Sequence, residues 1–546
     1  MRPHVLFVLA VLALEAVPVL AQTAPMRGGP PPLVVEASDF GVVADAAVNN
    51  ARALQTALDR AGYLQRRAPG RVAEVVLPCH RPFAASGEAI GYAGETAIPD
   101  SVALVGCGGT EVVPATDEHG HRYRPVREVA AAGRSESRLR VLDGSVYDAG
   151  TGPLVTRFGV APGATWFALR DVVLDGNWRG NLAAYAAIPE AVQKPYLQDG
   201  NGWAALALDG SAGRPECRPP SAEGGGGGRL HVELRRIAIT GYGANGIVGT
   251  ECVEYDGEAV RLGSALHNHV FYGGNAVFRG LTLEGFAWTH MVVMADVDVS
   301  DLVYEDPARN PSGRWNPELV NVRAGALTVR GMHADTRLAT TGGSGGEVVQ
   351  LLRSDEGRAD LDGLVWLARD AGSLGSAGDG GVFRHGRVYA DHLALLLGGV
   401  YHGAPPRDGR AHVYVQDVEV AGRLGGLFED RGSHPVLARL DGVRASGLFV
   451  LGGPADDGIG AGPPGALALT DSALRLDPAA SVHTGGHLMG NGRGAYLTPH
   501  TICADAATRA ASGPGGGAPL ALNASATEHC LALLATPIPP APGPPR

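Results

Sequence analysis

The residues best suited to chemistry follow the run FALRDVVLDG in the first half of the chain. Asp175, Asn177 and Arg179 lie there, and Asp199 and Trp203 come later in the same region. Two carboxylates can act as general acid and base on a sugar chain, and an aromatic ring can stack on a sugar. We therefore predict Asp175 and Asp199 as catalytic residues, with Asn177, Arg179 and Trp203 as substrate ligands. Turn formation is the alternative, because Asp-Gly and Asn-Gly are ordinary turn sequences.

A second group combines a histidine with a carboxylate. Glu251 and His290 are further predicted catalytic residues, since a histidine beside a carboxylate can titrate near neutral pH. Tyr242 supplies a ring that could stack on a sugar, and Arg353 and Arg384, further along the chain, could hold an acidic sugar. An ordinary polar surface is the alternative for this group.

Three aspartates in ADVDVSDL are the predicted metal ligands: Asp296, Asp298 and Asp301. Asp296 and Asp298 alternate with valines, so both carboxylates lie on the same side of a strand. Calcium, which prefers several oxygen ligands, is the predicted cofactor and would neutralise an acidic sugar. The alternative is a solvated strand face.

These residues must be positioned by elements that recur along the chain. The clearest copy is Val232–Gly249, VELRRIAITGYGANGIVG, where apolar and polar residues alternate before a glycine turn. Similar phrases recur from Leu281 onward at intervals of about 20 to 35 residues, which is the spacing of a solenoid. Each copy is too short to bury its own apolar side, so stacked copies must share one core. The sequence therefore predicts an all-β fold, a parallel β-helix.

Composition narrows the choice of function. The chain has 546 residues with 80 glycines and 38 prolines, which suits a stack of short strands and tight turns. A formal net charge of −11 argues against broad nucleic-acid binding, which needs a basic surface. Lys194 is the only lysine, so catalysis by a lysine amine is not expected.

Residues 1–21 have the features of a secretory signal peptide: an early arginine, an apolar segment and a small-residue cleavage site. We therefore expect a secreted protein, and no later segment is long and apolar enough to span a membrane. Export would allow the six cysteines to form disulfides, and pairing in sequence order is our choice among 15 arrangements. The expected bonds are Cys79–Cys107, Cys217–Cys252 and Cys503–Cys530, with free buried thiols as the alternative.

The domain boundaries follow from pattern and composition. The β-helix is expected over 33–475, with insertions at 177–230 and 250–275 that form the walls of a binding groove. C-terminal strands are expected over 476–535. A Pro- and Gly-rich leader at 22–32 and a Pro-rich tail at 536–546 are expected to be disordered.

The open end of a solenoid needs a cap, and an amphipathic helix is predicted there. Apolar residues recur at helical spacing from Ala53 to Ala61. Asn49 or Asn50 is the expected N-cap, and Gly62 is the expected end of the helix.

Several short motifs around this helix carry a family resemblance. They are Asp39-Phe40-Gly41, Ala53–Leu58, Val75–Pro78, Ile98-Pro99 and Leu104–Gly108. The set resembles the N-terminal part of the pectate-lyase-like superfamily of right-handed parallel β-helix proteins. Leu174–Asn177 is similar to a coil of mannuronan C5-epimerases and polygalacturonase-related proteins, but the Asp-Pro-His-Glu catalytic group of the epimerases is absent. The resemblance thus implies a right-handed β-helix and a carbohydrate ligand, without a mechanism.

We therefore expect an exported enzyme that acts on a polysaccharide, either a lyase or a glycoside hydrolase. Its groove would lie under the two insertions. The step from fold to function is analogy, because one fold serves many activities. A non-catalytic glycan-binding or adhesive β-helix is the alternative, and the missing catalytic group of the family favours it.

Overall fold

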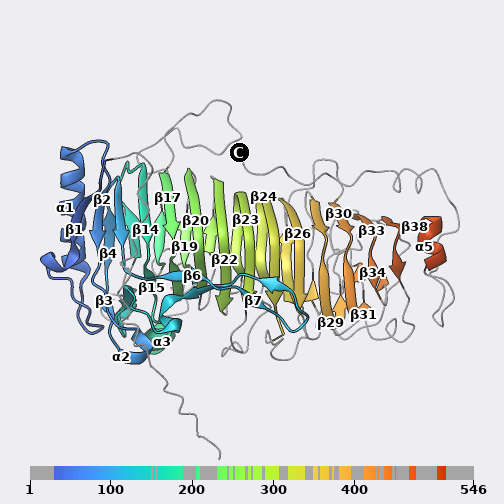
Figure 1. Cartoon of the computed structure of the whole chain (residues 1–546), viewed down its shortest axis with the longest axis horizontal. Helices are drawn as coiled ribbons and strands as arrows, with labels where there is room; N and C mark the ends of the chain where they lie inside the picture. The colour runs from blue at the N-terminus through green and yellow to red at the C-terminus, as the bar shows by residue number, and fades with distance from the viewer. Residues whose placement is uncertain are drawn as a thin grey trace, which may run out of the picture.

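The computed structural model is a right-handed parallel β-helix, drawn with its long axis horizontal in Figure 1. The structure describes residues 30–148, 152–153, 157–188 and, with several gaps, 204–511. The larger gaps in that last range are 209–229, 306–317, 338–348, 395–410, 451–465 and 475–500. The signal peptide and the Pro-rich tail lie outside the described residues, so both stay predictions.

The strands of successive coils pair in parallel along three faces. Face 1 consists of β1 (Leu33–Glu36), β2 (Ala73–Val76), β5 (Val102–Val105), β14 (Trp166–Arg170), β17 (Leu230–Arg235), parts of β20 (Val253–Ser264), β22 (Asn275–Gly285), β23 (Thr289–Glu305), β24 (Glu318–Asp335) and β26 (Arg358–Leu367), then β28 (Gly380–Arg384), β30 (Ala411–Gln416), β33 (Val436–Asp441), β36 (Ala466–Thr470) and β38 (Thr501–Ala504).

Face 2 carries the candidate site described below. It consists of β3 (Ile90–Tyr92), β10 (Arg138–Val141), β15 (Val173–Asp175), β18 (Ala238–Tyr242), the later parts of β20, β22, β23, β24 and β26, then β29 (Arg387–Ala394), β31 (Glu419–Gly425), β34 (Arg444–Ala445) and β37 (Ala473–Leu474).

Face 3 completes the coils. It consists of β4 (Glu95–Ile98), β13 (Arg157–Val160), β16 (Leu206–Leu208), β19 (Ile247–Gly249), β21 (His269–Phe271), the first parts of β23 and β24, then β25 (Val349–Ser354) and β27 (Gly372–Ser373). β32 (Leu427–Phe428) follows β31 in the chain and pairs in parallel with β35 (Phe449–Val450), which follows β34, in a separate short sheet. β11 (Tyr147–Asp148) pairs antiparallel with β12 (Gly152–Pro153).

One residue at the corner between face 1 and face 2 has a positive φ in coil after coil. These corner residues, with φ from 43° to 77°, are Asp171, Arg236, Ala259, Gly280, Asp301, Gly331, Gly363, His385, Asp417, Gly442 and Asp471. The left-handed conformation turns the chain sharply, and glycine adopts it without strain while aspartate tolerates it. The next residue points into the core, where Val172, Ile237 and Leu281 are fully buried. The recurrent phrase in the sequence is this corner together with the strand after it.

The predicted cap is present as α1 (Ala51–Arg67), which covers the N-terminal end of the stack (Figure 1). Asn50 occupies the N-cap position, but its side-chain oxygen accepts the amide of Val43 at 2.9 Å and does not cap the helix. The helix also runs past Gly62, whose expected role as its end was wrong. A Cβ at Gly62 would lie 2.8 Å from the Cβ of Pro99. This glycine therefore allows the helix to approach the strand end closely.

The strands that the structure describes within the expected insertion at 250–275 belong to the stack instead. β20 pairs in parallel with β17 and β22, and β21 pairs with β19 and β23. Within 177–230, the structure describes α3 (Trp178–Ala186), which leaves the stack, and β16, which returns to it. Within 476–535 it describes β38 and α5 (Ala506–Ala511), which lies at the far end of the β-helix (Figure 1).

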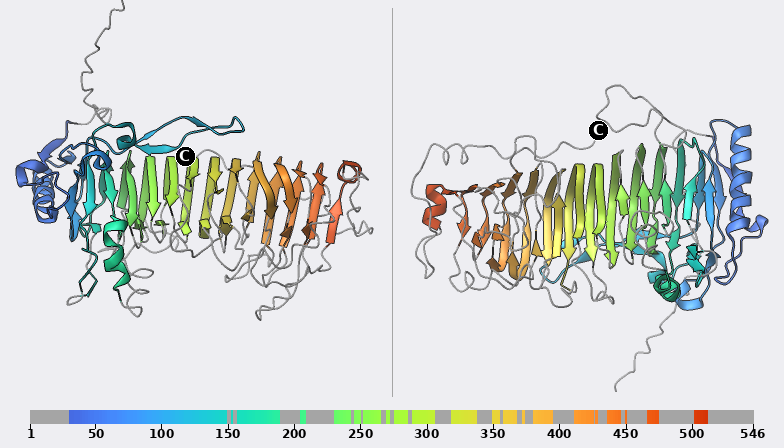
Figure 2. Two further views of the ribbon diagram at one scale, coloured as in Figure 1. Left: turned by 90° about the horizontal axis from the view of Figure 1, so that it is seen from below. Right: turned by 180° about the vertical axis from the view of Figure 1, so that it is seen from behind.

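A long hairpin that the sequence analysis did not anticipate leaves the stack between β5 and β10. We call residues 110–128 the arm. It is built from β6 (Thr110–Val112) paired with β9 (Val126–Glu128), and from β7 (Ala115–Thr116) paired with β8 (Arg122–Tyr123). The turns η1 (Ala37–Phe40) and η2 (Val129–Ala132) and the short helix α2 (Phe83–Ser86) complete the N-terminal part. Figures 1 and 2 show the arm running along the outside of the β-helix toward β29.

The arm starts beside a disulfide. Cys79 and Cys107 are bonded, as the sequence order predicted, with a Cα–Cα distance of 5.8 Å. Cys252 and Cys503 are also disulfide-bonded. Their expected partners, Cys217 and Cys530, lie outside the described residues, so these two pairings stay predictions. None of the helices that the structure describes has the length and hydrophobicity to cross a bilayer.

Candidate functional site

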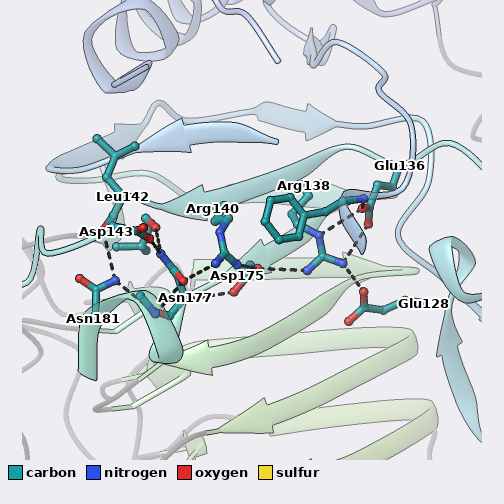
Figure 3. Close-up of polar contacts among 12 residues, drawn as sticks. Glu128, Glu136, Arg138, Arg140, Leu142, Asp143, Asp175, Asn177 and Asn181 are labelled. Carbon is teal, nitrogen blue, oxygen red and sulfur yellow. Dashed lines mark hydrogen bonds and ion pairs between the residues drawn. The ribbon is translucent and has the colours of Figure 1, made fainter. Parts of the chain in front are cut away.

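The first predicted group forms a closed polar network at the N-terminal end of face 2 (Figure 3). Asp175 accepts hydrogen bonds from Arg140 at 2.6 Å, from Arg138 at 3.3 Å and from the amide of Asn177 at 2.8 Å. Asn177, with φ 54°, donates to the carbonyl of Val141 at 2.8 Å and accepts from Arg140. Asp175 and Asn177 are each less than a tenth exposed. These contacts use their polar atoms within the protein, while Arg179 stands exposed on α3.

Arg138 is the centre of this network. It contacts Glu136 at 3.0 Å, and it also contacts Asp175 and Glu128, the last residue of the arm. Burial alone would lower the pKa of Arg138, but the three carboxylates outweigh burial and the pKa is raised. The network is therefore an internal cluster of matched charges that ties the base of the arm to face 2.

Tyr242 and Arg384 are unsuited to the substrate contacts predicted for them. Tyr242 is fully buried in the core, and its hydroxyl shares a hydrogen bond with that of Tyr92. Burial raises the pKa of both phenols. Arg384 is 4 % exposed and donates to both oxygens of Asp360 at 2.7 and 2.9 Å. Neither side chain can therefore reach a sugar on the surface.

The other predicted side chains cannot be placed. Asp199, Trp203 and Glu251 lie outside the described residues. His290 and Arg353 belong to β23 and β25, but the structure does not describe their side chains. Their roles stay predictions.

The three predicted metal ligands have separate partners. Asp296 is exposed and accepts the amide of Ala326 at 3.1 Å, whereas Asp298 accepts from Arg330 at 2.6 Å. Asp301 occupies a corner and faces Arg124 of the arm at 3.4 Å. Within the described part of the chain, no three acidic, histidine or cysteine side chains gather in a way that could hold a metal. Calcium binding remains a prediction without a described site.

A cavity of about 430 Å³ opens between the arm and face 2, in the size range of small-ligand sites. The arm contributes Tyr123 and Arg127. Face 2 contributes Arg261, Glu284, Glu305, His333 and Asp335, from β20, β22, β23 and β24. We call this cavity the arm pocket.

Three acidic residues in the arm pocket form one column. The strand register pairs Glu284 with Glu305, and Glu305 with Asp335, in successive coils. Each lies four residues after its corner, which is Gly280, Asp301 or Gly331. Their side chains therefore leave face 2 in the same direction, one above another.

Glu284 and Glu305 are each held by two nitrogens of one arginine. Glu284 accepts from Nε of Arg261 at 2.9 Å and also from its Nη2. Burial raises the pKa of Glu284, Glu128 and Glu305 add to the rise, and Arg261 opposes it. Glu305 accepts from both terminal nitrogens of Arg127, a pairing that raises the pKa of this arginine. The column thus places Glu284, whose pKa is raised, next to Glu305, which is paired with an arginine of the arm.

His333 lies on the same wall with only 6 % of its side chain exposed. Its ring stacks on Tyr123 of the arm with centroids 3.8 Å apart, and its Nε2 lies 3.2 Å from Oδ2 of Asp117. Burial lowers the pKa of His333, more than Asp117 raises it. The imidazole is therefore held neutral between two residues of the arm.

Further contacts hold the arm along its length. Near its base, the amide of Val126 donates to Oγ1 of Thr282 at 2.8 Å, and Arg261 donates to the carbonyl of Val126 at 2.7 Å. Near its tip, His119 stacks on Tyr389 at 3.7 Å, and His121 lies 2.6 Å from the hydroxyl of Tyr389. The pocket wall is consequently fixed in place from both ends.

Sequence reasoning missed every residue of the arm pocket. A signal for the acidic column was present, because the phrases GLTLEG, DLVYED and GMHAD place an acidic residue at one offset from the corner. Aligning these phrases would have placed Glu284, Glu305 and Asp335 together. No comparable signal marks Tyr123 or Arg127, because the arm has no repeat that relates it to the coils it covers.

Comparison with known proteins adds little to this geometry. No family model matches the sequence, and no curated protein matches it. The solved structures that match include two A-modules of Azotobacter vinelandii mannuronan C-5 epimerases. AlgE6 shares 14% identity over 88% of this chain and 99% of its own, with a TM-score of 0.33. AlgE4 shares 14% identity over 86% of this chain and 99% of its own, with a TM-score of 0.30. A likeness this distant carries no argument about activity, so function must be argued from the site.

Proposed function

We propose that this protein is a glycan-active β-helix that hydrolyses glycosidic bonds in the arm pocket. The observation that carries the proposal is the pair Glu284 and Glu305, which are register partners in a cavity. Glycoside hydrolysis typically uses one carboxyl group as acid and a second as nucleophile or base. The raised pKa of Glu284 supports its role as the acid.

Glu284 is the proposed acid and Glu305 the proposed nucleophile. The backbones of neighbouring strands are about 4.8 Å apart. Side chains that leave register partners in the same direction have a similar spacing, which is close to the ~5–5.5 Å between the two carboxyl groups of retaining enzymes. Glu284 would donate its proton to the bridging oxygen while Glu305 attacks the anomeric carbon. Water would then release the sugar from Glu305, with Glu284 taking the proton from that water.

The charge of the pocket supports a neutral glycan over an acidic one. Arg127 and Arg261 are both paired with glutamates, and Asp335 is paired with Arg337 at 2.6 Å. The lowered pKa of His333 means that it adds no positive charge near neutral pH. A uronate would therefore meet no unmatched cation among the described residues of the pocket. This favours a hydrolase of neutral polysaccharide over a lyase that acts on uronates.

A non-catalytic glycan-binding solenoid is the second candidate. The same ion pairs favour it, because each acidic residue of the column already has an arginine partner. A substrate would need to displace part of these contacts before Glu284 or Glu305 could react. Binding without turnover would be the signature of this alternative.

We also propose that the protein is exported. The apolar N-terminal segment supports this, and so does the Cys79–Cys107 disulfide, because structural disulfides persist mainly in oxidising compartments. A fusion of residues 1–40 to a reporter, followed by fractionation and N-terminal sequencing, tests it. A reporter retained inside the cell would contradict the proposal.

The decisive experiment is a turnover screen of the purified mature protein. Neutral β-glucan, xylan and mannan are compared with pectate and alginate, and released reducing ends are measured together with absorbance from unsaturated uronates. Reducing ends from a neutral polymer support the hydrolase, and uronate absorbance would contradict it. Glu284→Gln should lower turnover about 10²- to 10⁴-fold.

The matched control is Glu419→Gln. Glu419 lies in β31 of face 2 and pairs with Arg387 at 3.3 Å, but it is exposed and outside the arm pocket. Turnover by this variant should equal that of the parent. Equal losses in Glu284→Gln and Glu419→Gln would show that the pocket is not the site of reaction.

A further inference from the structure

One polar atom of His333 has no hydrogen-bond partner among the residues that the structure describes. This atom, Nδ1, is buried, although the His333 side chain lines the arm pocket. A buried polar nitrogen without a partner is unfavourable, so native structures rarely keep one unless it has a role. The unpartnered nitrogen therefore indicates that the pocket binds a ligand.

Whether Nδ1 carries a proton follows from Asp117, which contacts Nε2 on the other side of the ring. Hydrogen bonds to the Asp117 carboxylate outweigh its burial and hold its pKa below the ordinary value, so this group only accepts. Near neutral pH, His333 is a neutral ring with one donor and one acceptor nitrogen. Nε2 must then donate to Asp117, and Nδ1 carries the lone pair.

We propose that Nδ1 of His333 accepts a hydrogen bond from a sugar hydroxyl of the bound glycan, with Asp117 as the positioning residue that fixes this acceptor. The inference rests on the proposed glycan-binding function and adds a residue that recognises the ligand. Asp117 lies at the arm turn, is not among the residues lining the pocket and acts only through His333. The other ionisable groups around the ring are Tyr123, Glu305 and Asp335.

The arm is therefore part of the binding site, because two of its residues contact His333. Asp117 orients the imidazole, and Tyr123 fixes the plane of its ring by stacking. Both residues come from the arm, which joins the β-helix several coils away in the N-terminal part. A β-helix with an undocked arm would keep His333 but lose its defined acceptor.

The first test exploits the fixed orientation of Asp117. Its Oδ1 accepts the amides of His119 and His121, both at 2.9 Å, while Oδ2 faces His333. In Asp117→Asn, the side-chain oxygen keeps the two amides, so the NH₂ group must face Nε2 and donate to it. The proton of His333 should then move to Nδ1.

Nitrogen NMR of histidine-labelled protein reads this out without any ligand. The signals of His333 are assigned by their loss in His333→Gln. We expect the Nε2–H tautomer in the parent and the Nδ1–H tautomer in Asp117→Asn. An Nδ1–H tautomer in the parent would overturn the inference.

The second test measures binding of fluorescently labelled β-1,4-linked hexasaccharides of glucose, xylose and mannose. His333→Gln keeps an amide donor near the Nε2 position but has no acceptor at Nδ1, whereas His333→Asn keeps an oxygen near Nδ1 and loses the contact with Asp117. In a Glu284→Gln background, His333→Gln should bind the best probe about 5- to 100-fold more weakly, because a ligand hydroxyl loses its acceptor. His333→Asn should lose less affinity despite lower thermal stability.

The outcomes separate this inference from the proposed hydrolase. Retained binding without turnover in the parent contradicts the hydrolase alone. Equal affinity of the Glu284→Gln protein with and without His333→Gln contradicts the role of Nδ1, whether or not turnover occurs. A parent that binds none of the three hexasaccharides would also overturn the assignment to a sugar hydroxyl.

Discussion

Gly109 at the root of the arm offers the sharpest test of how the arm pocket is held. The substitution Gly109→Ala would place a Cβ 2.7 Å from the amide nitrogen of Val172 and closer still to the carbonyl oxygen of Arg236. Side-chain Cβ atoms essentially never come within 3.0 Å of such atoms. Both neighbours are backbone of the stacked coils and cannot rotate away, so the root of the arm must shift.

The size of the effect follows from the hydrogen bonds at this root. The amide of Thr110 donates to the carbonyl of Arg236 at 3.0 Å, and the amide of Val129 donates to the carbonyl of Gly109 at 3.0 Å. A shift that breaks both removes about 0.5–1.5 kcal/mol for each bond. The expected loss of stability is therefore about 1–3 kcal/mol, the range usual for overpacked sites.

Amide hydrogen exchange of the arm, combined with urea denaturation, measures this loss. Exchange should accelerate at β6 and β9 while the core of face 2 changes little, and ligand affinity should fall because Tyr123 and Arg127 lose their positions. The control is Gly159→Ala, whose Cβ would meet nothing closer than 3.8 Å and whose strand position favours alanine slightly. Arm exchange that is the same in the two variants would refute this account of the root.

Three further predictions concern the rest of the fold. Tyr92→Phe or Tyr242→Phe leaves the other buried hydroxyl without its hydrogen-bond partner and should lower the free energy of unfolding by about 1–3 kcal/mol. In a double-mutant cycle, the double variant should lose less stability than the sum of the two single losses. Among the described residues, Arg384→Met leaves its buried partner Asp360 with only the longer contact to Arg358 at 3.8 Å and should cost about 3–5 kcal/mol in urea denaturation, against less than about 1 kcal/mol for the exposed Arg387→Met. The raised pKa of Glu284 means that the folded state holds this proton more tightly than the unfolded chain. Its stabilising contribution should thus be complete below about pH 4.3 and lost as the pH rises through the folded pKa, and the stability difference between the parent and Glu284→Gln across pH 4–9 tests this sign.

The repeated part of the fold could be predicted because one local rule recurs. Each coil repeats a corner residue followed by an inward apolar residue, as in Asp171-Val172 and Gly280-Leu281, and such a pattern is visible in sequence. The cap helix was predictable for the same reason, since its buried residues repeat at helical spacing. Its end was not, because Gly62 is retained for close approach to Pro99, a contact that no local pattern encodes.

Residue type and spacing were weaker guides to the site. Asp175 and Tyr242 had suitable chemistry, yet the sequence does not show which side of a coil is covered or which ring enters the core. Residues 250–275 were predicted to be an insertion, although they contain β20, a strand of the stack. The wrong site residues and the wrong insertion have the same cause. Both depend on contacts between coils, which are set by the strand register.

Asp175 and Glu284 have different charged neighbours, and the difference shows how the arm changes the surroundings of a carboxyl group on face 2. Both lie four residues after a corner on face 2, so the β-helix presents them in equivalent positions. Beside Asp175, the stack itself supplies Arg138 and Arg140 from β10, and the charge is neutralised by a closed network. Beside Glu284, the described part of the stack supplies Arg261, and the arm brings Glu128 nearby, while burial raises the pKa of Glu284 and Glu128 adds to the rise. Repetition therefore supplies a row of carboxyl groups, and a single non-repeated hairpin helps to raise the pKa of one of them.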